Sequence, residues 1–164
     1  MAAKKAKTSA KKANNSAKKP KVQASKAKSL AKPQAKKSAL APPATERVFT
    51  GTPWEPRIAY CRAIRSGDLI AVSGCAPVAE GGGIHAPGDA YAQTLRCLQI
   101  ALNALAKLGA GPEHVVRTRM FVTDISRWQE YGRAHGEVFA QHPPTTSMIG
   151  ISALIEQGML VEVE

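Results

Sequence analysis

Two amphipathic helical patterns separated by β-prone segments restrict residues 46–164 to folds in which helices cover a sheet. The first pattern follows Asp89, a residue type that favours the helix N-cap, and ends before Gly109, which is typical of the position after a helix. Five leucines recur between them at spacings of three and four: Leu95, Leu98, Leu102, Leu105 and Leu108. This spacing predicts a helix with one apolar face, which must be buried against another element.

The second helical pattern begins near residue 126. Ser126 and Gln129 have the spacing of a capping box. Four larger side chains follow at helical spacing: Trp128, Tyr131, His135 and Val138. Because His135 lies on this stripe, we interpret it as a packed core histidine rather than a catalytic base. Pro143 and Pro144 prevent the chain from continuing as a helix.

Alternating apolar and polar residues predict the strands. Residues 58–73 contain two β-prone runs separated by Ser-Gly-Asp at 66–68, which favours a hairpin turn. The other strand segments are 115–125, 145–152 and 159–164, with 47–51 as a candidate edge strand. The order β-β-α-β-α-β-β predicts an α+β fold with one sheet and two helices on one face. The other sheet face is then exposed to water or packed against another subunit.

Arg117 and Arg119 lie two residues apart in the segment 115–125, so a strand places both side chains on one sheet face. Two neighbouring guanidinium groups can recognise an anion or an anionic substrate. They can also form structural ion pairs with Asp or Glu across an interface, and we favour this second interpretation.

The charge of the chain changes abruptly at residue 45. Residues 1–45 contain 13 lysines and no acidic residue, whereas residues 46–164 contain 10 basic and 12 acidic residues. The first segment also lacks aromatic residues, so we predict a disordered Lys/Ala-rich tail and a folded domain at 46–164. Such a tail binds nucleic acid without sequence preference by neutralising phosphates. A solubilising extension, or a start codon placed too early, explains it equally well.

The sequence indicates no membrane span, leader peptide or metal centre. No run approaches 18 apolar residues, and the apolar core of a secretion signal is missing. Cys61, Cys75 and Cys97 lack the spacing of a disulfide framework, and the histidines lack the paired spacing of a zinc site. We therefore predict a cytoplasmic protein with reduced thiols and with no metal or cofactor.

Several motifs occur in a recognisable order over residues 47–164: PWEP, YCRAIRSGDLIAVSGCAPV, GDAYAQT, VVRTRMFVTDI, RAHGEVF and LVEVE. As a set they resemble the RidA (YjgF) family. The resemblance implies a chorismate-mutase-like α+β fold, a homotrimer packed through its sheets, and ligand clefts between subunits. It also implies cofactor-independent hydrolysis of reactive enamines and imines such as 2-aminoacrylate to a 2-keto acid and ammonia. The cleft residues that it implies here are Tyr60, Ser73, Gly74 and Glu162, with Glu162 as the catalytic acid–base.

The arginine that defines the deaminase members is missing. They carry it at the second position after a proline that enters the penultimate strand, and here that position is Thr146. A threonine supplies no positive charge for a substrate carboxylate, so we expect efficient hydrolysis of 2-aminoacrylate to be impaired. Met148 is a further candidate for substrate contact, as are Arg117 and Arg119, which are the first candidates to replace the missing arginine.

These observations leave two functions open. The first is a RidA-like trimer that binds a small metabolite in clefts between its subunits and hydrolyses an enamine or imine. The second is a non-enzymatic trimer that binds nucleic acid through lysine-rich tails, whose linkage raises avidity. Ribonuclease activity, described for some family members, is our third choice, because no pair of histidines is placed for acid–base cleavage of RNA.

Overall fold

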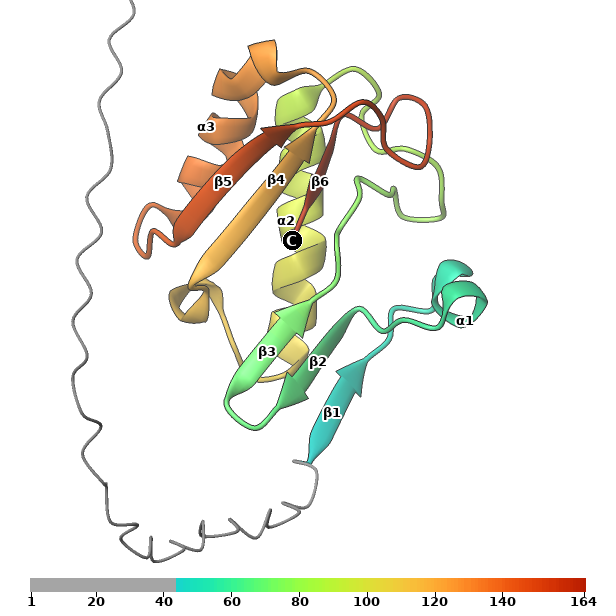
Figure 1. The fold of residues 1–164 in the computed structure, drawn as a ribbon, viewed down its shortest axis with the longest axis vertical. Helices are drawn as coiled ribbons and strands as arrows, with labels where there is room; N and C mark the ends of the chain where they lie inside the picture. Colours follow the sequence, from blue (N-terminus) through green and yellow to red (C-terminus); the bar gives the residue numbers. More distant parts are fainter. Residues whose placement is uncertain (1–43) are drawn as a thin grey trace, which may run out of the picture. The chain divides into compact units, whose positions relative to one another are not determined.

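Strands and helices alternate along residues 44–164, the part of the chain that this computed structural model describes (Figure 1). The elements are β1 (Thr45–Val48), α1 (Trp54–Ile58), β2 (Ala63–Ser66), β3 (Leu69–Val72), α2 (Ala90–Lys107), β4 (Arg117–Val122), α3 (Trp128–Phe139), β5 (Thr145–Gly150) and β6 (Val161–Val163). The predicted α+β order is confirmed from β2 onward, with β1 as the additional edge strand and α1 as a short helix that the sequence patterns missed. β1 begins at Thr45, one residue before the predicted boundary. The rest of the predicted tail lies outside the described residues.

The strands form two three-stranded sheets, in the orders β1-β2-β3 and β5-β4-β6. This differs from the single continuous sheet that the sequence predicts. One bridge joins the sheets, because Cys75 and Val163 exchange backbone hydrogen bonds of 2.8 and 3.1 Å. The two sheets separate just before Cys75. There the Ser73 N–H donates to the carbonyl of Arg62, and the side chain of Glu162 lies against Gly74.

The predicted hairpin between β2 and β3 is confirmed. Ser66 pairs with Leu69 across a two-residue turn. Gly67 occupies this turn with φ of 61°, a conformation that glycine adopts without the steric cost of a side chain.

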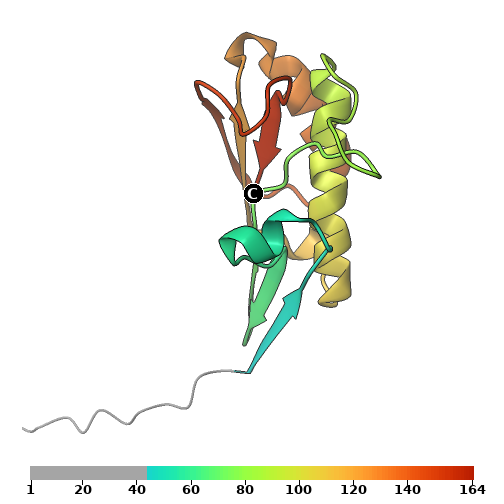
Figure 2. The same cartoon turned by 90° about the vertical axis from the view of Figure 1, so that its right-hand side faces the viewer.

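Both long helices cover the same side of the sheets, and the opposite side is left open (Figure 2). α2 packs on β6, β3 and α3. It is capped as predicted, since the Asp89 side chain accepts a hydrogen bond of 2.9 Å from the Ala92 N–H. The predicted leucine stripe is only partly correct, because Leu95 and Leu102 are half-buried. The buried face instead contains small side chains that let the helix approach the sheet closely, among them Ala90, Cys97 and Ala104.

α3 does not begin with the predicted capping box. Residues Ile125–Arg127 form a 3₁₀ turn before it, and Asp124 caps this turn. The Asp124 Oδ1 accepts hydrogen bonds from the N–H and the hydroxyl of Ser126, at 3.0 and 2.6 Å. α3 follows directly on this turn, with Arg127 at its N-cap and no side-chain capping bond, so the predicted capping box of Ser126 with Gln129 is wrong.

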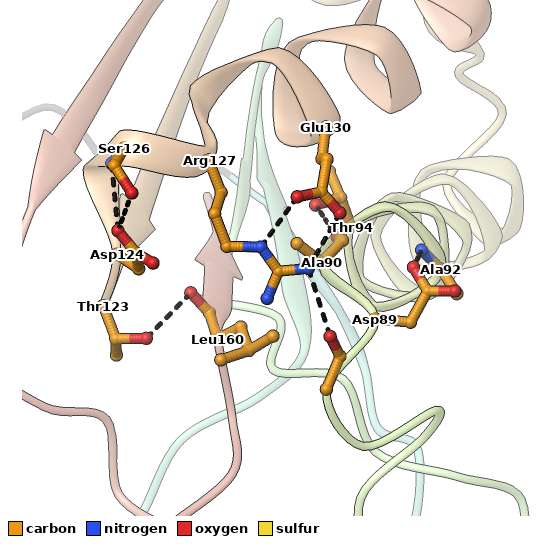
Figure 3. Close-up of polar contacts among 11 residues, drawn as sticks. Asp89, Ala90, Ala92, Thr94, Thr123, Asp124, Ser126, Arg127, Glu130 and Leu160 are labelled. Carbon is orange, nitrogen blue, oxygen red and sulfur yellow. Dashed lines mark hydrogen bonds and ion pairs between the residues drawn. The ribbon is translucent and has the colours of Figure 1, made fainter.

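The starts of the two long helices are tied together by Arg127 (Figure 3). Its guanidinium pairs with Glu130 at 2.7 and 2.8 Å and donates to the carbonyl of Gly88, next to the α2 cap, at 3.1 Å. Close by, the Thr123 hydroxyl donates to the carbonyl of Leu160 at 3.5 Å. These contacts fix the loop that leads into α2 against the end of β4.

β4 has the predicted alternation. Thr118, Met120 and Val122 are buried against the helices, whereas Arg117 and Arg119 are exposed on the open face. The main core cluster combines residues from both helices and from β4 and β6: Cys75, Ala90, Cys97, Leu98, Met120, Val122, Tyr131, Phe139, Val161 and Val163. The polar face of β4 is thus left free for contacts outside this core.

Candidate functional site

The predicted site residues fall into two groups on opposite faces of the sheet β5-β4-β6. Thr146 of β5 pairs with Thr118 of β4, so its side chain is on the helix-covered face, as is that of Met148. Glu162 of β6 pairs with Phe121 of β4, so its side chain is on the open face. A single chain therefore does not bring Thr146 and Glu162 into one pocket.

Glu162 lies at the junction of the two sheets, directly against Gly74. A Cβ built on Gly74 would be only 2.5 Å from Glu162 Oε1, so a glycine is required for the carboxylate to occupy this place. Burial raises the pKa of the Glu162 carboxyl, the positive charge of Arg62 opposes this, and Glu164 adds a further increase. A raised pKa moves a carboxyl group toward the range in which general acid–base catalysts work.

Arg62 is a member of this first group that the sequence patterns missed. Its side chain is only 7% exposed, and its two terminal nitrogens donate to the carbonyl of Gly74 at 2.6 Å and to the Tyr60 hydroxyl at 3.0 Å. Among residues 44–164, no carboxylate lies within 4.0 Å of this guanidinium, and its Nε has no hydrogen-bond partner. Tyr60 and Arg62 both precede β2, outside any strand, so the period-two pattern of the strands did not indicate Arg62.

Tyr60 and Ser73 complete the first group in different ways. The Tyr60 ring lies 5.3 Å from the guanidinium carbon of Arg62, and its hydroxyl is 3.3 Å from that of Thr52. The Ser73 hydroxyl donates to the carbonyl of Cys61 at 2.7 Å. Ser73 therefore holds the end of β3 in place, while Tyr60 keeps its aromatic face near Arg62.

Arg117 and Arg119 lie on the open face, away from Thr146. Arg119 forms an ion pair with Glu164, and Arg117 donates to the Ser147 hydroxyl at 3.0 Å. For Arg119 this agrees with the interpretation as a structural ion pair, although the partner lies within the chain. Direct substrate contact by either arginine stays a prediction.

The second group connects Thr146 to a buried histidine. Thr118 Oγ1 lies 2.9 Å from His135 Nε2, and the Thr118 hydroxyl donates to Thr146 Oγ1 at 2.9 Å. His135 is 9% exposed, and burial lowers the pKa of its imidazole. The predicted packed histidine is thus hydrogen-bonded through one threonine to the residue that replaces the family arginine.

In the part of the chain that the structure describes, no three His, Cys, Asp or Glu side chains are grouped so that they could hold a metal ion. Cys75 and Cys97 are free and buried, and burial raises the pKa of both thiols. None of the helices of residues 44–164 is long and apolar enough to cross a membrane.

Both groups lie within a segment that matches a known protein family. The family model described as Endoribonuclease L-PSP matches residues 51–164. The chain belongs to this family, the RidA (YjgF) family. The chorismate-mutase-like fold that the sequence resemblance implied is confirmed by the solved structures of other RidA-family proteins.

The relatives include proteins with and without a stated activity. An uncharacterized protein of Streptomyces coelicolor is 35% identical over 121 residues, which cover 74% of this chain and 90% of the relative. The 3-aminoacrylate deaminase RutC of Acinetobacter baylyi is 26% identical over 113 residues, covering 69% of this chain and 88% of RutC. A crystal structure from Mycobacterium tuberculosis, described as a member of the YjgF/YER057c/UK114 family, has 39% identity and a TM-score of 0.66, covering 73% of this chain and 95% of that one.

Proposed function

We propose that this protein hydrolyses an enamine or imine to a carbonyl compound and ammonia, without a metal or cofactor, in clefts between the subunits of a homotrimer. The observation that carries this proposal is the position of Glu162, half-buried against Gly74 with a raised pKa, where Arg62 donates to both the Gly74 carbonyl and the Tyr60 hydroxyl. The deaminase named among the relatives supports the reaction class. A cytoplasmic location stays a prediction.

The separation of the two groups supports a site shared by two subunits. Thr146 and Glu162 lie on opposite faces of their sheet, so one chain supplies only one of them to any cleft. β5 is an edge strand, and the open sheet face carries no helix. In a trimer packed through the sheets, the β5 edge of one subunit can lie next to the Glu162 region of its neighbour.

Glu162 can perform both proton transfers that the reaction needs. In its protonated form it gives a proton to the β-carbon of the enamine, which produces an iminium ion. The resulting carboxylate accepts a proton from the water that attacks the iminium carbon. The carbinolamine then loses ammonia and leaves the carbonyl product, so that one water is consumed for each ammonia released.

We expect the wild-type protein to hydrolyse 2-aminoacrylate slowly and Thr146→Arg to raise kcat/KM about tenfold or more, because a guanidinium would hold the substrate carboxylate through a charge-assisted hydrogen bond. Thr146 is exposed on an edge strand, which leaves room for the larger side chain. Pyruvate formation followed with lactate dehydrogenase measures the rate. Thr145→Arg is the matched control, since it adds the same charge to an exposed residue on the other face of β5 and should not raise the rate. No hydrolysis by any of these proteins would contradict the proposed function.

A second candidate function rests on residues 1–45, whose 13 lysines are not balanced by any acidic residue. We propose that this segment binds nucleic acid without sequence preference. Binding of the full chain to a DNA duplex should weaken with salt, with a slope of about −0.9 in log K against log salt for each phosphate contact. Removing residues 1–43, which leaves β1 intact, should abolish binding in a fluorescence anisotropy titration. Equal binding by the shortened protein would rule this function out.

A further inference from the structure

The hydrogen bonds around Thr146 form a short chain from the interior to the surface. His135 is 9% exposed and Thr118 is 3% exposed, whereas Thr146 is exposed on the edge strand β5. Consecutive polar atoms in this chain, His135 Nε2, Thr118 Oγ1 and Thr146 Oγ1, are each 2.9 Å apart. The pairing of β4 with β5 brings Thr118 beside Thr146, and α3 places His135 next to Thr118.

The hydrogen-bond chain from His135 to Thr146 has a direction, because each hydroxyl carries one hydrogen. The Thr118 hydroxyl donates to Thr146, so it has no hydrogen left for His135. His135 Nε2 must therefore carry the hydrogen that bonds to Thr118. The Thr146 hydroxyl accepts from Thr118 and has no acceptor of its own among the described residues. Its hydrogen is free to bond to a ligand, and the preceding hydrogen bonds polarise it.

The hydrogen-bond chain ends in a donor without a positive charge, the Thr146 hydroxyl. Burial lowers the pKa of the His135 imidazole and so favours its neutral form. Where the deaminase members of the family carry a guanidinium, this protein presents a polarised hydroxyl. A neutral donor of this kind is sufficient for a carbonyl oxygen. A carboxylate that leaves water needs a positively charged partner, which a hydroxyl does not supply.

We propose that Thr146 determines specificity for a small substrate with an uncharged carbonyl group, such as an amide, in place of a free carboxylate. Thr118 and His135 are positioning residues that aim and polarise the Thr146 hydroxyl. This inference rests on the proposed function, since it assigns the substrate class of the same cleft. It adds that the cleft distinguishes an amide from the corresponding acid, although the two substrates have nearly equal shape.

The test compares pyruvamide with pyruvate as probes of the full-length protein, by following amide resonances of β5 in nitrogen–proton correlation NMR spectra. We expect wild type to bind pyruvamide at least about threefold more tightly than pyruvate, and Thr146→Val to weaken pyruvamide binding about three- to tenfold, as the loss of one neutral hydrogen bond implies. Thr146→Ser keeps the hydroxyl and should retain the preference. Thr146→Arg should reverse it.

The positioning role is tested separately at Thr118. Thr118→Val should weaken pyruvamide binding by a similar factor and leave pyruvate binding unchanged, and Thr118→Ser should restore it. The ring nitrogen shifts of His135 should show the hydrogen on Nε2 and should change when pyruvamide binds, which a purely structural histidine would not do. Equal affinity of wild type for both probes, no response of β5 to either probe, or a preference unaffected by Thr118→Val would overturn the inference. If hydrolysis depends on Glu162 while both probes bind equally, the proposed function stands and only this inference fails.

Discussion

Glutamine in place of Glu162 is expected to reduce enamine hydrolysis at least about a hundredfold while increasing the stability of the protein above neutral pH. The activity falls because glutamine cannot transfer protons, and general acid–base catalysis contributes about 10²–10⁴-fold. The stability rises because the substitution removes an ionised carboxylate from a half-buried position. Pyruvate release and urea unfolding of the same preparation measure both effects.

The stability effect should depend on pH in a defined direction. A carboxyl with a raised folded-state pKa contributes stability that is fully present below the ordinary glutamate pKa, and this contribution is lost as pH rises through the raised value. Wild type and Glu162→Gln should therefore differ least in acid, and the advantage of the variant should grow from pH 4 to pH 8, across roughly the ordinary range of a glutamate pKa and above it.

Glu164→Gln is the matched control for this prediction. Glu164 lies two residues further along the chain and forms an ion pair with Arg119 on the open face, with about a third of its side chain exposed. Its replacement should leave hydrolysis within about threefold and change stability by less than about 1 kcal/mol. If Glu162→Gln and Glu164→Gln lost the same activity, the loss would result from removing negative charge in this region rather than from a specific role of Glu162.

Replacement of Arg62 by methionine is expected to cost about 2–4 kcal/mol of stability and to raise the pKa of Glu162 further. The loss follows from the hydrogen bonds that the guanidinium donates to the Gly74 carbonyl and the Tyr60 hydroxyl, both at a buried residue. The pKa rises because the positive charge that opposes the effect of burial on Glu162 is removed. Urea unfolding and an NMR titration of the Glu162 side chain test the two parts.

Two further variants separate the charge of Arg62 from its packing. Arg62→Lys keeps the charge but loses the planar donor geometry, so the pKa of Glu162 should stay near its wild-type value while stability still falls. Arg119→Met removes an arginine whose side chain is half exposed and should cost less than about 1 kcal/mol. An unchanged Glu162 pKa in Arg62→Met would show that the charge of Arg62 does not influence it.

The sequence was sufficient where a structural feature depends on neighbouring residues. The alternation of residues 115–125 predicted that Arg117 and Arg119 share one face of β4, because each strand residue points to the face opposite that of the next. The Asp89 cap and the Gly67 turn were also predicted correctly, since both depend on a few consecutive residues. At the start of α3 this local information was ambiguous: Asp124 caps the 3₁₀ turn that precedes the helix, and the capping bond assigned to Ser126 does not form.

The candidate site was only partly predictable. Family motifs identified Gly74 and Glu162, but the sequence could not show that Thr146 and Glu162 face opposite sides of their sheet, because this depends on how β5 and β6 pair with β4. The rotation of the α2 buried face toward Cys97 was also unpredictable, because it is set by the sheet against which the helix packs.

The sequence by itself therefore determined the order of the elements, the α+β class and the family, because these depend on periodicity and on local motifs. Only the tertiary structure placed the Arg62 guanidinium against the Gly74 carbonyl, 12 residues along the chain, and connected Thr118 to His135 and to Thr146, which are 17 and 28 residues away from it in the sequence. Hydrogen bonds of this kind form between groups that packing brings within 3 Å of each other, and no pattern of neighbouring residues encodes that distance.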